Sequence, residues 1–271
     1  MKTLENHIIL FDEECPMCKG YTKAFINAGM LNEGGRESYQ NAPESVCPVI
    51  DRQRAVNEIA LVNQETGEVT YGIKSLFKVI ANSFPLFGPL FSFQPFIWLM
   101  SKVYAFIAYN RRVIVPPHRG DGFRFQPTFK IHYRIAYLLF TWFCTGFILS
   151  IYVRLVAGVI PSGGRWREYL IIGAQLVVQG LVISIIAKDK FWNYLGNMMT
   201  ISFAGSLLLL LPLALNHWWH NQPVFYTIYF LSVAWLMLLE HVRRMKLMEL
   251  GYTMTITWIL FRIVVMLLIL R

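Results

Sequence analysis

The chain has 271 residues, of which 55% are hydrophobic, and its formal net charge is +9 at pH 7. Residues 1–129 carry 13 Lys and Arg against 12 Asp and Glu, whereas residues 130–271 carry 12 against 4. Because the basic excess accompanies the more apolar part of the chain, it indicates membrane flanks, and we expect no nucleic-acid partner. Four cysteines, only two of them close together, are too few for a secreted disulfide scaffold.

The first predicted elements are a strand, a tight loop and a helix that carries two cysteines. An apolar run, residues 8–11, stops at Asp12, and a helical pattern follows the pair Cys15 and Cys18. Pro16 suits the first position of a helix, so we place Cys15 at or just before the helix N-terminus and Cys18 one turn inside. In this arrangement Cys15 is the more reactive thiol, and Cys18 lies where it can resolve a mixed disulfide.

Two opposing effects set the expected acidity of Cys15. The helix N-terminus stabilises its thiolate, whereas the carboxylates of Glu13 and Glu14 repel it. We therefore predict that the pKa of Cys15 is about 7–8. We also predict that Cys15 is both more exposed and more acidic than Cys18.

The segment that follows predicts a small α/β domain. Residues 30–56 are polar and rich in turn formers, and the sequence predicts no element there. Residues 58–62 and 68–71 are predicted as strands joined by a turn, and the apolar spacing from Ile73 onward predicts an amphipathic helix. This order favours a mixed sheet with helices packed on it.

Residues 84–115 are rich in aromatic side chains and are interrupted by Pro and Gly. They are interpreted as a pair of helices packed on the sheet, or as an interfacial platform with Arg111 and Arg112 on lipid phosphates; the two interpretations are compatible. Residues 116–129 combine Pro, Gly and charges of both signs, which is typical of a linker. The predicted domains are therefore residues 1–115, including the aromatic extension at about 84–115, and residues 130–271.

Several motifs of the first domain resemble those of a known family. They are Phe11-Asp12-x-x-Cys15-x-x-Cys18-x-Gly20-Tyr21, Gly72 before a helix, and Tyr109-Asn110-Arg111. Together they are similar to the DCC family of thiol-disulfide oxidoreductases, which is named after its Asp-x-x-Cys-x-x-Cys signature and regarded as thioredoxin-like. The resemblance covers about residues 7–115 and implies that Cys15 is the nucleophile, Cys18 the resolving thiol and Asp12 the signature acid. Glu13 and Glu14 depart from the family pattern, and Pro48 is a candidate for a cis-proline next to the site.

Residues 130–271 contain five apolar runs, which predict an all-α bundle of about five transmembrane helices. The runs cover about residues 135–160, 169–187, 198–215, 224–239 and 254–270. Basic residues are unevenly placed on their flanks, with seven on one side (Lys130, Arg134, Lys188, Lys190, Arg243, Arg244, Lys246) and three on the other (Arg165, Arg167, Arg271). The positive-inside rule then predicts a multi-pass protein of the inner (cytoplasmic) membrane with its N-terminal domain in the cytoplasm and its C-terminus outside. The N-terminus shows no cleavable signal pattern, which agrees with this orientation.

Polar residues within these runs are costly in lipid and therefore informative. Gln175 and Gln179 are four residues apart, as are Asn193 and Asn197, and we interpret these amides as helix–helix hydrogen-bonding groups. Arg262 lies near the middle of the last run. It is interpreted either as a structural residue held by a carbonyl or a tyrosine, or as a site for an anionic headgroup or a partner carboxylate.

These observations favour a membrane-anchored thiol-disulfide oxidoreductase whose Cys15–Cys18 dithiol faces the cytoplasm. Its expected partners are a protein thiol or disulfide substrate or a membrane protein, together with the lipid bilayer. A dithiol relay across the membrane is not expected, because Cys144 is the only cysteine beyond the first domain. The alternative is a catalytically idle thioredoxin-like domain that serves as a membrane interaction module or as a subunit of a larger complex.

Two further interpretations of Cys15 and Cys18 remain open at this point. They could be chemically inert cysteines, or they could belong to a structural metal site, which normally needs four ligands. Cys47 together with His7 or His118 could complete such a site, but no other residues have ligand spacing. We therefore predict neither a metal nor a cofactor.

Overall fold

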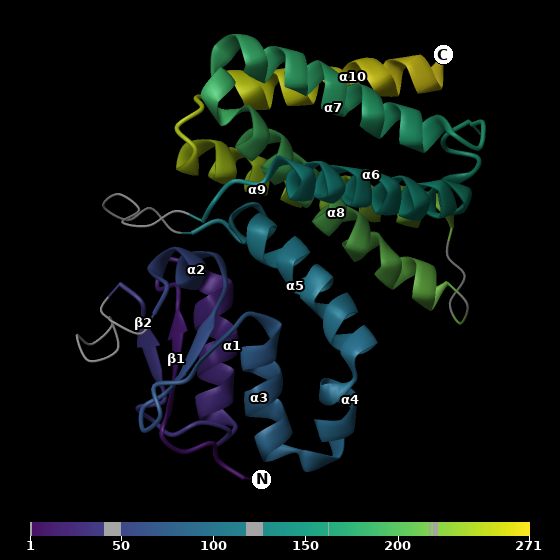
Figure 1. Ribbon diagram of the computed structural model, residues 1–271. Helices are drawn as coiled ribbons and strands as arrows, with labels where there is room; N and C mark the ends of the chain where they lie inside the picture. Colours follow the sequence, from purple (N-terminus) through teal and green to yellow (C-terminus); the bar gives the residue numbers. More distant parts are fainter. Residues whose placement is uncertain (1, 41–49, 118–126, 162, 217, 219–221) are drawn as a thin grey trace. The chain divides into compact units, whose positions relative to one another are not determined.

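The computed structural model describes residues 2–40, 50–117, 127–161, 163–216, 218 and 222–271 (Figure 1). Contacts within the chain divide it into two compact units, Met1–Tyr133 and Arg134–Arg271. A small mixed sheet with helices comes first, and five long apolar helices follow. The predicted fold class is therefore confirmed.

The first unit contains a four-stranded sheet with the order β2-β1-β3-β4. Strand β1 is parallel to β2 and antiparallel to β3, and β4 is antiparallel to β3. The elements are β1 (His7–Phe11), α1 (Pro16–Asn27), β2 (Arg36–Ser38), α2 (Arg52–Asn57), β3 (Ala60–Asn63), β4 (Val69–Tyr71) and α3 (Ile73–Ser83). Strand β2 and most of helix α2 fall within residues 30–56, where the sequence predicts no element. The three residues of β2 have no apolar alternation, and the strand forms because its backbone pairs with β1.

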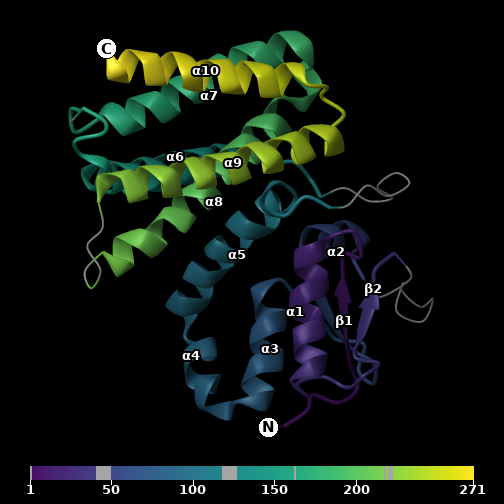
Figure 2. The same ribbon diagram turned by 180° about the vertical axis from the view of Figure 1, so that it is seen from behind.

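Both faces of the sheet are covered, as the alternation along β1 requires. Ile9 and Phe11 belong to a core cluster that includes residues of α1 and α3. Ile8 and Leu10 belong to a second cluster that includes Ala55 of α2. Figures 1 and 2 show α1 and α3 on the same side of the sheet.

Gly72 connects β4 to α3 in a backbone conformation that favours glycine. Its φ angle is +65°, and a Cβ atom there would lie 3.0 Å from a carboxylate oxygen of Glu58. Its backbone N–H donates to the carbonyl of Ile59 at 2.8 Å, which holds the turn against β3. The glycine is thus required by the sharp entry into α3.

The aromatic segment forms η2 (Pro85–Phe87), α4 (Gly88–Ser92) and α5 (Gln94–Ile114), with a bend of 88° between Pro85–Ser92 and α5. The ring of Phe77 in α3 stacks on Phe91 and Phe96, with centroid distances of 4.2 Å and 5.6 Å. The segment therefore packs on α3, which agrees with the interpretation as packed helices. Leu86 and Trp98 on the same segment are 89% and 65% exposed, and an interfacial platform stays a prediction.

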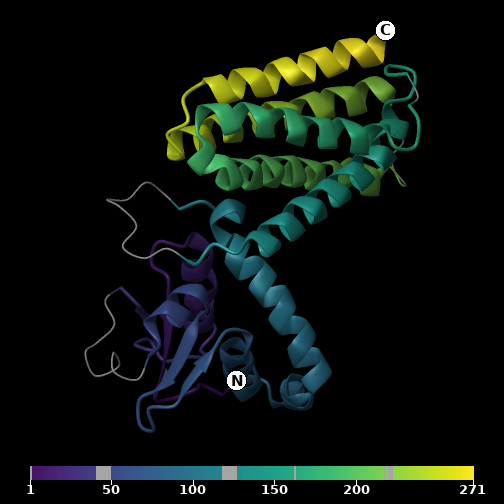
Figure 3. The ribbon, with the colours of Figure 1, turned by 45° about the horizontal axis from the view of Figure 1, so that its top comes forward.

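The second unit is helical. Its elements are most of α6 (Ile131–Tyr152), then η3 (Val153–Val156), α7 (Arg167–Ile186), η4 (Lys188–Lys190), α8 (Phe191–Leu215), α9 (Pro223–Leu247) and α10 (Thr253–Leu270). Within the described residues, five helices are long and apolar enough to cross a membrane, or six if the bent pair Pro85–Ser92 and Gln94–Ile114 counts as one span. The third span begins at Lys188, ten residues before the predicted start at residue 198. In Figure 3, α10 (yellow) lies along one side of this bundle.

Buried amides link the helices of the second unit, as the sequence predicts for Gln175, Gln179 and Asn197, whereas Asn193 is exposed at the surface of the unit. The Gln179 side-chain oxygen in α7 accepts a hydrogen bond from the Tyr194 hydroxyl in α8 at 2.6 Å. The Asn197 side-chain oxygen in α8 accepts one from the Arg244 guanidinium in α9 at 2.8 Å. Such bonds matter in lipid because unpaired polar groups find no water there.

Candidate active site

The candidate site lies where β1 ends and α1 begins. Asp12 follows the last residue of β1, and Cys15 is the N-cap of α1, with Pro16 as the first helical residue. The backbone N–H of Cys18 donates to the Cys15 sulfur at 3.4 Å, so the cysteine side chain caps its own helix. This is the predicted placement of both cysteines. It aims the positive end of the helix at the Cys15 sulfur.

The prediction that Cys15 is the more exposed thiol is wrong. Cys15 is 2% exposed and Cys18 is 6% exposed, and both belong to the apolar cluster between α1 and the sheet. The physical reason is the cap itself. To accept the N–H of Cys18, the Cys15 sulfur must turn toward the first turn of the helix rather than toward solvent.

The two thiols nevertheless differ strongly in acidity. Hydrogen bonds from the thiol and the backbone N–H of Cys18 lower the pKa of Cys15 to about 6, against the effect of burial. The thiol–thiol hydrogen bond and burial both raise the pKa of Cys18. The pair therefore consists of one thiol poised to ionise and one held protonated.

The pKa of Cys15 is lower than the predicted 7–8 chiefly because the prediction did not include the hydrogen bonds from Cys18. Glu14 pairs with Arg112 at 3.2 Å, and Glu13 is exposed to solvent. The charge of Arg111 further lowers the pKa of Cys15. The sequence shows the two glutamates beside Cys15 but not that arginines lie close to them, since Arg112, at the end of α5, is 98 positions from Glu14.

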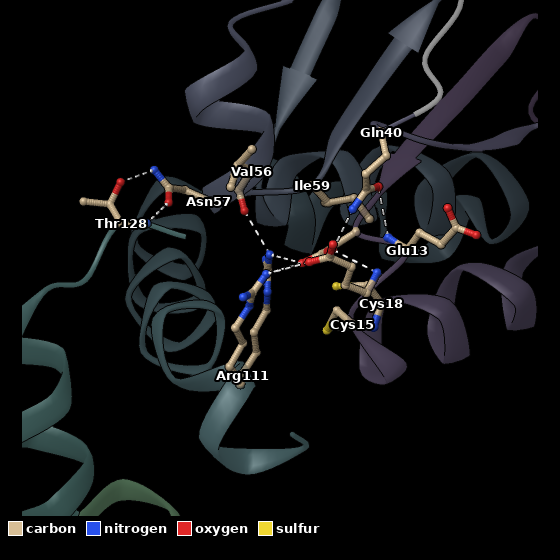
Figure 4. Close-up of polar contacts among 12 residues, drawn as sticks. Glu13, Cys15, Cys18, Gln40, Val56, Asn57, Ile59, Arg111 and Thr128 are labelled. Carbon is tan, nitrogen blue, oxygen red and sulfur yellow. Dashed lines mark hydrogen bonds and ion pairs between the residues drawn. The ribbon is translucent and has the colours of Figure 1, made fainter. Parts of the chain in front are cut away.

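A buried ion pair between Arg111 and Asp12 lies next to the two cysteines (Figure 4). A guanidinium nitrogen of Arg111 lies 2.7 Å from a carboxylate oxygen of Asp12, with the two side chains 6% and 1% exposed. The same nitrogen donates to the backbone carbonyl of Val56 at 2.9 Å. Arg111 is thus committed to Asp12, so the expectation that it lies on lipid phosphates is wrong. Arg112 likewise pairs with Glu14.

Gln40 completes the surroundings of Asp12. Asp12 follows β1 and Gln40 comes shortly after β2; because the carboxyl ends of parallel strands meet at one edge, the two residues are neighbours. The Gln40 amide donates to Asp12 at 3.1 Å and accepts the backbone N–H of Glu13 at 3.2 Å (Figure 4). The sequence analysis missed Gln40 because its proximity to Asp12 depends on the unpredicted strand β2.

Comparison with known protein families adds an independent finding. Residues 9–115 match the family model of the DCC1-like thiol-disulfide oxidoreductases. This segment is a DCC1-like domain. The resemblance seen in the sequence is thereby confirmed, and the match extends from β1 to the residue after α5. Neither a curated protein nor a solved structure matches the chain.

Within the DCC1-like domain, the Asp12–Arg111 pair joins the two ends of the matched segment. Tyr104, also from α5, accepts the backbone N–H of Ile59 at 2.9 Å. Burial raises the pKa of Tyr104 and of Tyr21, so both hydroxyls stay protonated beside the thiols. Helix α5 is therefore part of the architecture of the site, although the sequence alone presents it as an aromatic extension.

The other residues that the sequence suggested as site candidates are not part of the described site around Cys15. Pro48, Cys47 and His118 lie outside the described residues, and the described part of the chain contains no cis peptide bond. In that part, no three His, Cys, Asp or Glu side chains are grouped as metal ligands. Arg262 lies in α10 of the second unit.

Proposed function

We propose that the protein is a membrane-anchored thiol-disulfide oxidoreductase that acts through Cys15 and Cys18. The observation that carries the proposal is the position of Cys15 as the N-cap of α1, with the backbone nitrogen of Cys18 3.4 Å from its sulfur. In this position the pKa of Cys15 is lowered to about 6, while that of Cys18 is raised. At pH 7, about nine tenths of a thiol with that pKa is thiolate. The thiolate is the form that attacks disulfides.

In the proposed reaction, the Cys15 thiolate attacks one sulfur of a substrate disulfide. A Cys15–substrate disulfide forms, and the other substrate sulfur leaves as a thiolate. Cys18 then loses its proton and attacks the Cys15 sulfur, which releases the second substrate thiolate and leaves a Cys15–Cys18 disulfide. Two electrons have passed to the substrate, and a second protein dithiol returns them to the pair in the next half-reaction.

The site explains how Cys18 can become reactive at the second step. While Cys15 is a thiolate, its charge and its hydrogen bond raise the pKa of Cys18. Both effects vanish when Cys15 enters a mixed disulfide, and the charge of Arg111, which lowers the pKa of Cys18, remains. Arg111 and Asp12 are in this view positioning residues that act on the thiols through their charges.

The mechanism requires that a substrate disulfide gain access to the buried Cys15 sulfur. With both thiols almost fully buried, a substrate disulfide can reach Cys15 only if the start of α1 opens locally. This burial also favours the second candidate function, in which the DCC1-like domain is a catalytically idle module that binds a membrane partner. The two functions differ in whether Cys15 exchanges disulfides in the native protein.

The proposed orientation places the dithiol in the cytoplasm and the C-terminus outside. The basic residues on the flanks support this orientation, but the support is weaker than the count of seven against three suggests, because two of the seven are buried. Arg134 donates to the Trp192 carbonyl at 2.7 Å and is buried, and Arg244 is buried against Asn197. Five of the seven inner charges then remain for the membrane surface, still more than the three outer ones.

Trapping with the full-length protein tests the proposed function. Cys18→Ser should accumulate mixed disulfides through Cys15, whereas Cys15→Ser, the matched control, should accumulate none. The reduction potential of the wild-type pair should fall within the range of known oxidoreductases, roughly −270 to −120 mV. If Cys18→Ser traps nothing and a stable partner co-purifies with both variants, the interaction module is the correct function.

A further inference from the structure

The second unit contains a cavity of about 600 Å³ between its helices. Residues of all five long helices line it, and most of them are apolar, including Leu149, Ile172, Leu209, Leu238 and Ile259. Its size falls within the roughly 300–1,000 Å³ of small-molecule sites. A molecule held there would thus lie mainly against hydrocarbon side chains.

One wall of the cavity carries a cluster of unsatisfied donors. The Arg262 guanidinium lies 4.1 Å from the centroid of the Trp258 ring and donates to the Gln175 side-chain oxygen at 3.3 Å. Among the described residues, three N–H groups of this cluster find no hydrogen-bond partner, namely Gln175 Nε2, Trp258 Nε1 and Arg262 Nε. Gln175 and Trp258 are only 4% and 2% exposed, so solvent does not satisfy these groups. All three are donors, and a ligand that satisfies them must present hydrogen-bond acceptors.

The positive charge of Arg262 further restricts the chemical class of the ligand. The described residues place no carboxylate within 4.0 Å of the Arg262 guanidinium, and Glu168, which also lines the cavity, pairs with Arg167 at 2.8 Å. The cavity therefore carries one uncompensated positive charge in the middle of an apolar helix. A neutral carbonyl would satisfy a donor but leave this charge unpaired, whereas an oxyanion would do both.

We propose that this cavity binds a lipid with an anionic oxygen head, a carboxylate or a phosphate. The head receives hydrogen bonds from Arg262, Gln175 and Trp258, and the hydrocarbon chain lies along the apolar walls. A guanidinium presents a planar fork of donors that suits either oxyanion. This inference concerns a site separate from the dithiol and does not depend on the proposed redox function.

Native mass spectrometry of the full-length, delipidated protein tests the proposal. The probes are oleate, phosphatidylglycerol, the neutral methyl oleate and the zwitterionic phosphatidylcholine. We expect a one-to-one adduct with oleate or phosphatidylglycerol at concentrations where methyl oleate and phosphatidylcholine do not bind. Binding of oleate alone assigns a carboxylate lipid, and binding of phosphatidylglycerol alone assigns a phospholipid.

Matched variants identify the site. Arg262→Gln should weaken binding at least tenfold, whereas Arg154→Gln, which removes an exposed arginine of η3 outside the cavity, should not. Gln175→Glu provides a second test if Arg262→Gln fails to fold, because the new carboxylate would pair with Arg262 and exclude an anionic head. A thermal melt establishes that each variant is folded. Wild-type binding in Gln175→Glu, or equal binding of oleate and methyl oleate, would overturn the proposal, as would the absence of any adduct.

Discussion

Replacement of Cys18 by alanine tests the origin of the acidity of Cys15. Hydrogen bonds from Cys18 are the largest effect that lowers the pKa of Cys15 to about 6. Alanine removes the thiol donor but keeps the backbone N–H that lies 3.4 Å from the Cys15 sulfur. A hydrogen bond to a charged group is worth about 1.5–3 kcal/mol, which corresponds to a pKa change of about 1–2. We therefore expect the pKa of Cys15 to rise to about 7–8 in Cys18→Ala.

The rate of alkylation by iodoacetamide measures this pKa, because only the thiolate reacts. The rate should be followed from pH 4 to 9 on the full-length protein, with the modified Cys15 peptide quantified by mass spectrometry. Expressing each rate relative to its high-pH plateau removes the effect of burial on access. At pH 6 the wild type should react at about half of its plateau rate, and Cys18→Ala at roughly a tenth to a hundredth of its own.

Cys18→Ser is the matched control for this measurement. Serine restores an O–H donor at the same position, so the pKa of Cys15 should stay closer to the wild-type value than in Cys18→Ala. A pKa of about 6 in Cys18→Ala would refute this reasoning and leave the helix N-terminus and Arg111 as the dominant effects. A wild-type pKa near the ordinary value of 9.0 would refute the cap geometry itself.

Three further predictions concern the ion pair and the membrane topology. The charge of Arg111 lowers the pKa of Cys15, so Arg111→Gln should raise that pKa by about 1. The charge of Asp12 raises the pKa of Cys15, so Asp12→Asn should lower it. Alkylation rates against pH measure both shifts, and shifts of the same sign would contradict the assigned charges. Arg111→Gln also leaves Asp12 buried without its partner and should lower the free energy of unfolding by about 3–5 kcal/mol in denaturant titrations, while an effect below 1 kcal/mol would argue against a buried pair. A reporter fused after Arg271 should be external and one inserted at Lys188–Lys190 cytoplasmic, and an internal C-terminus would mean that the number of spans differs from five.

Local chemistry made several parts of the molecule predictable. The apolar residues 8–11, Pro16 and the spacing of Cys15 and Cys18 define β1, the loop and the start of α1, because strand periodicity and helix capping depend on neighbours within a few residues. The five apolar helices are predictable for a similar reason, since the free energy of crossing a membrane is nearly a sum over adjacent residues. The ends of these helices are less predictable, and α8 begins well before its most apolar part.

The chemistry of the candidate sites depends on residues that only the fold brings together. Arg111 lies 99 positions from Asp12, and its charge reaches the thiols only because α5 packs back toward β1. The sequence pointed to Glu13 and Glu14 as the charges that govern the pKa of Cys15. In the folded chain the hydrogen bonds from Cys18 have the largest lowering effect, and the charge of Arg111 adds to it. Electrostatic interactions and hydrogen bonds depend on distance in space, and tertiary packing sets that distance. For the same reason, Arg262 is recognisable in the sequence as a charge in an apolar helix, but its contact with Gln175 follows only from the packing of α7 against α10. Its stacking on Trp258 is local, because the two residues lie four positions apart in α10.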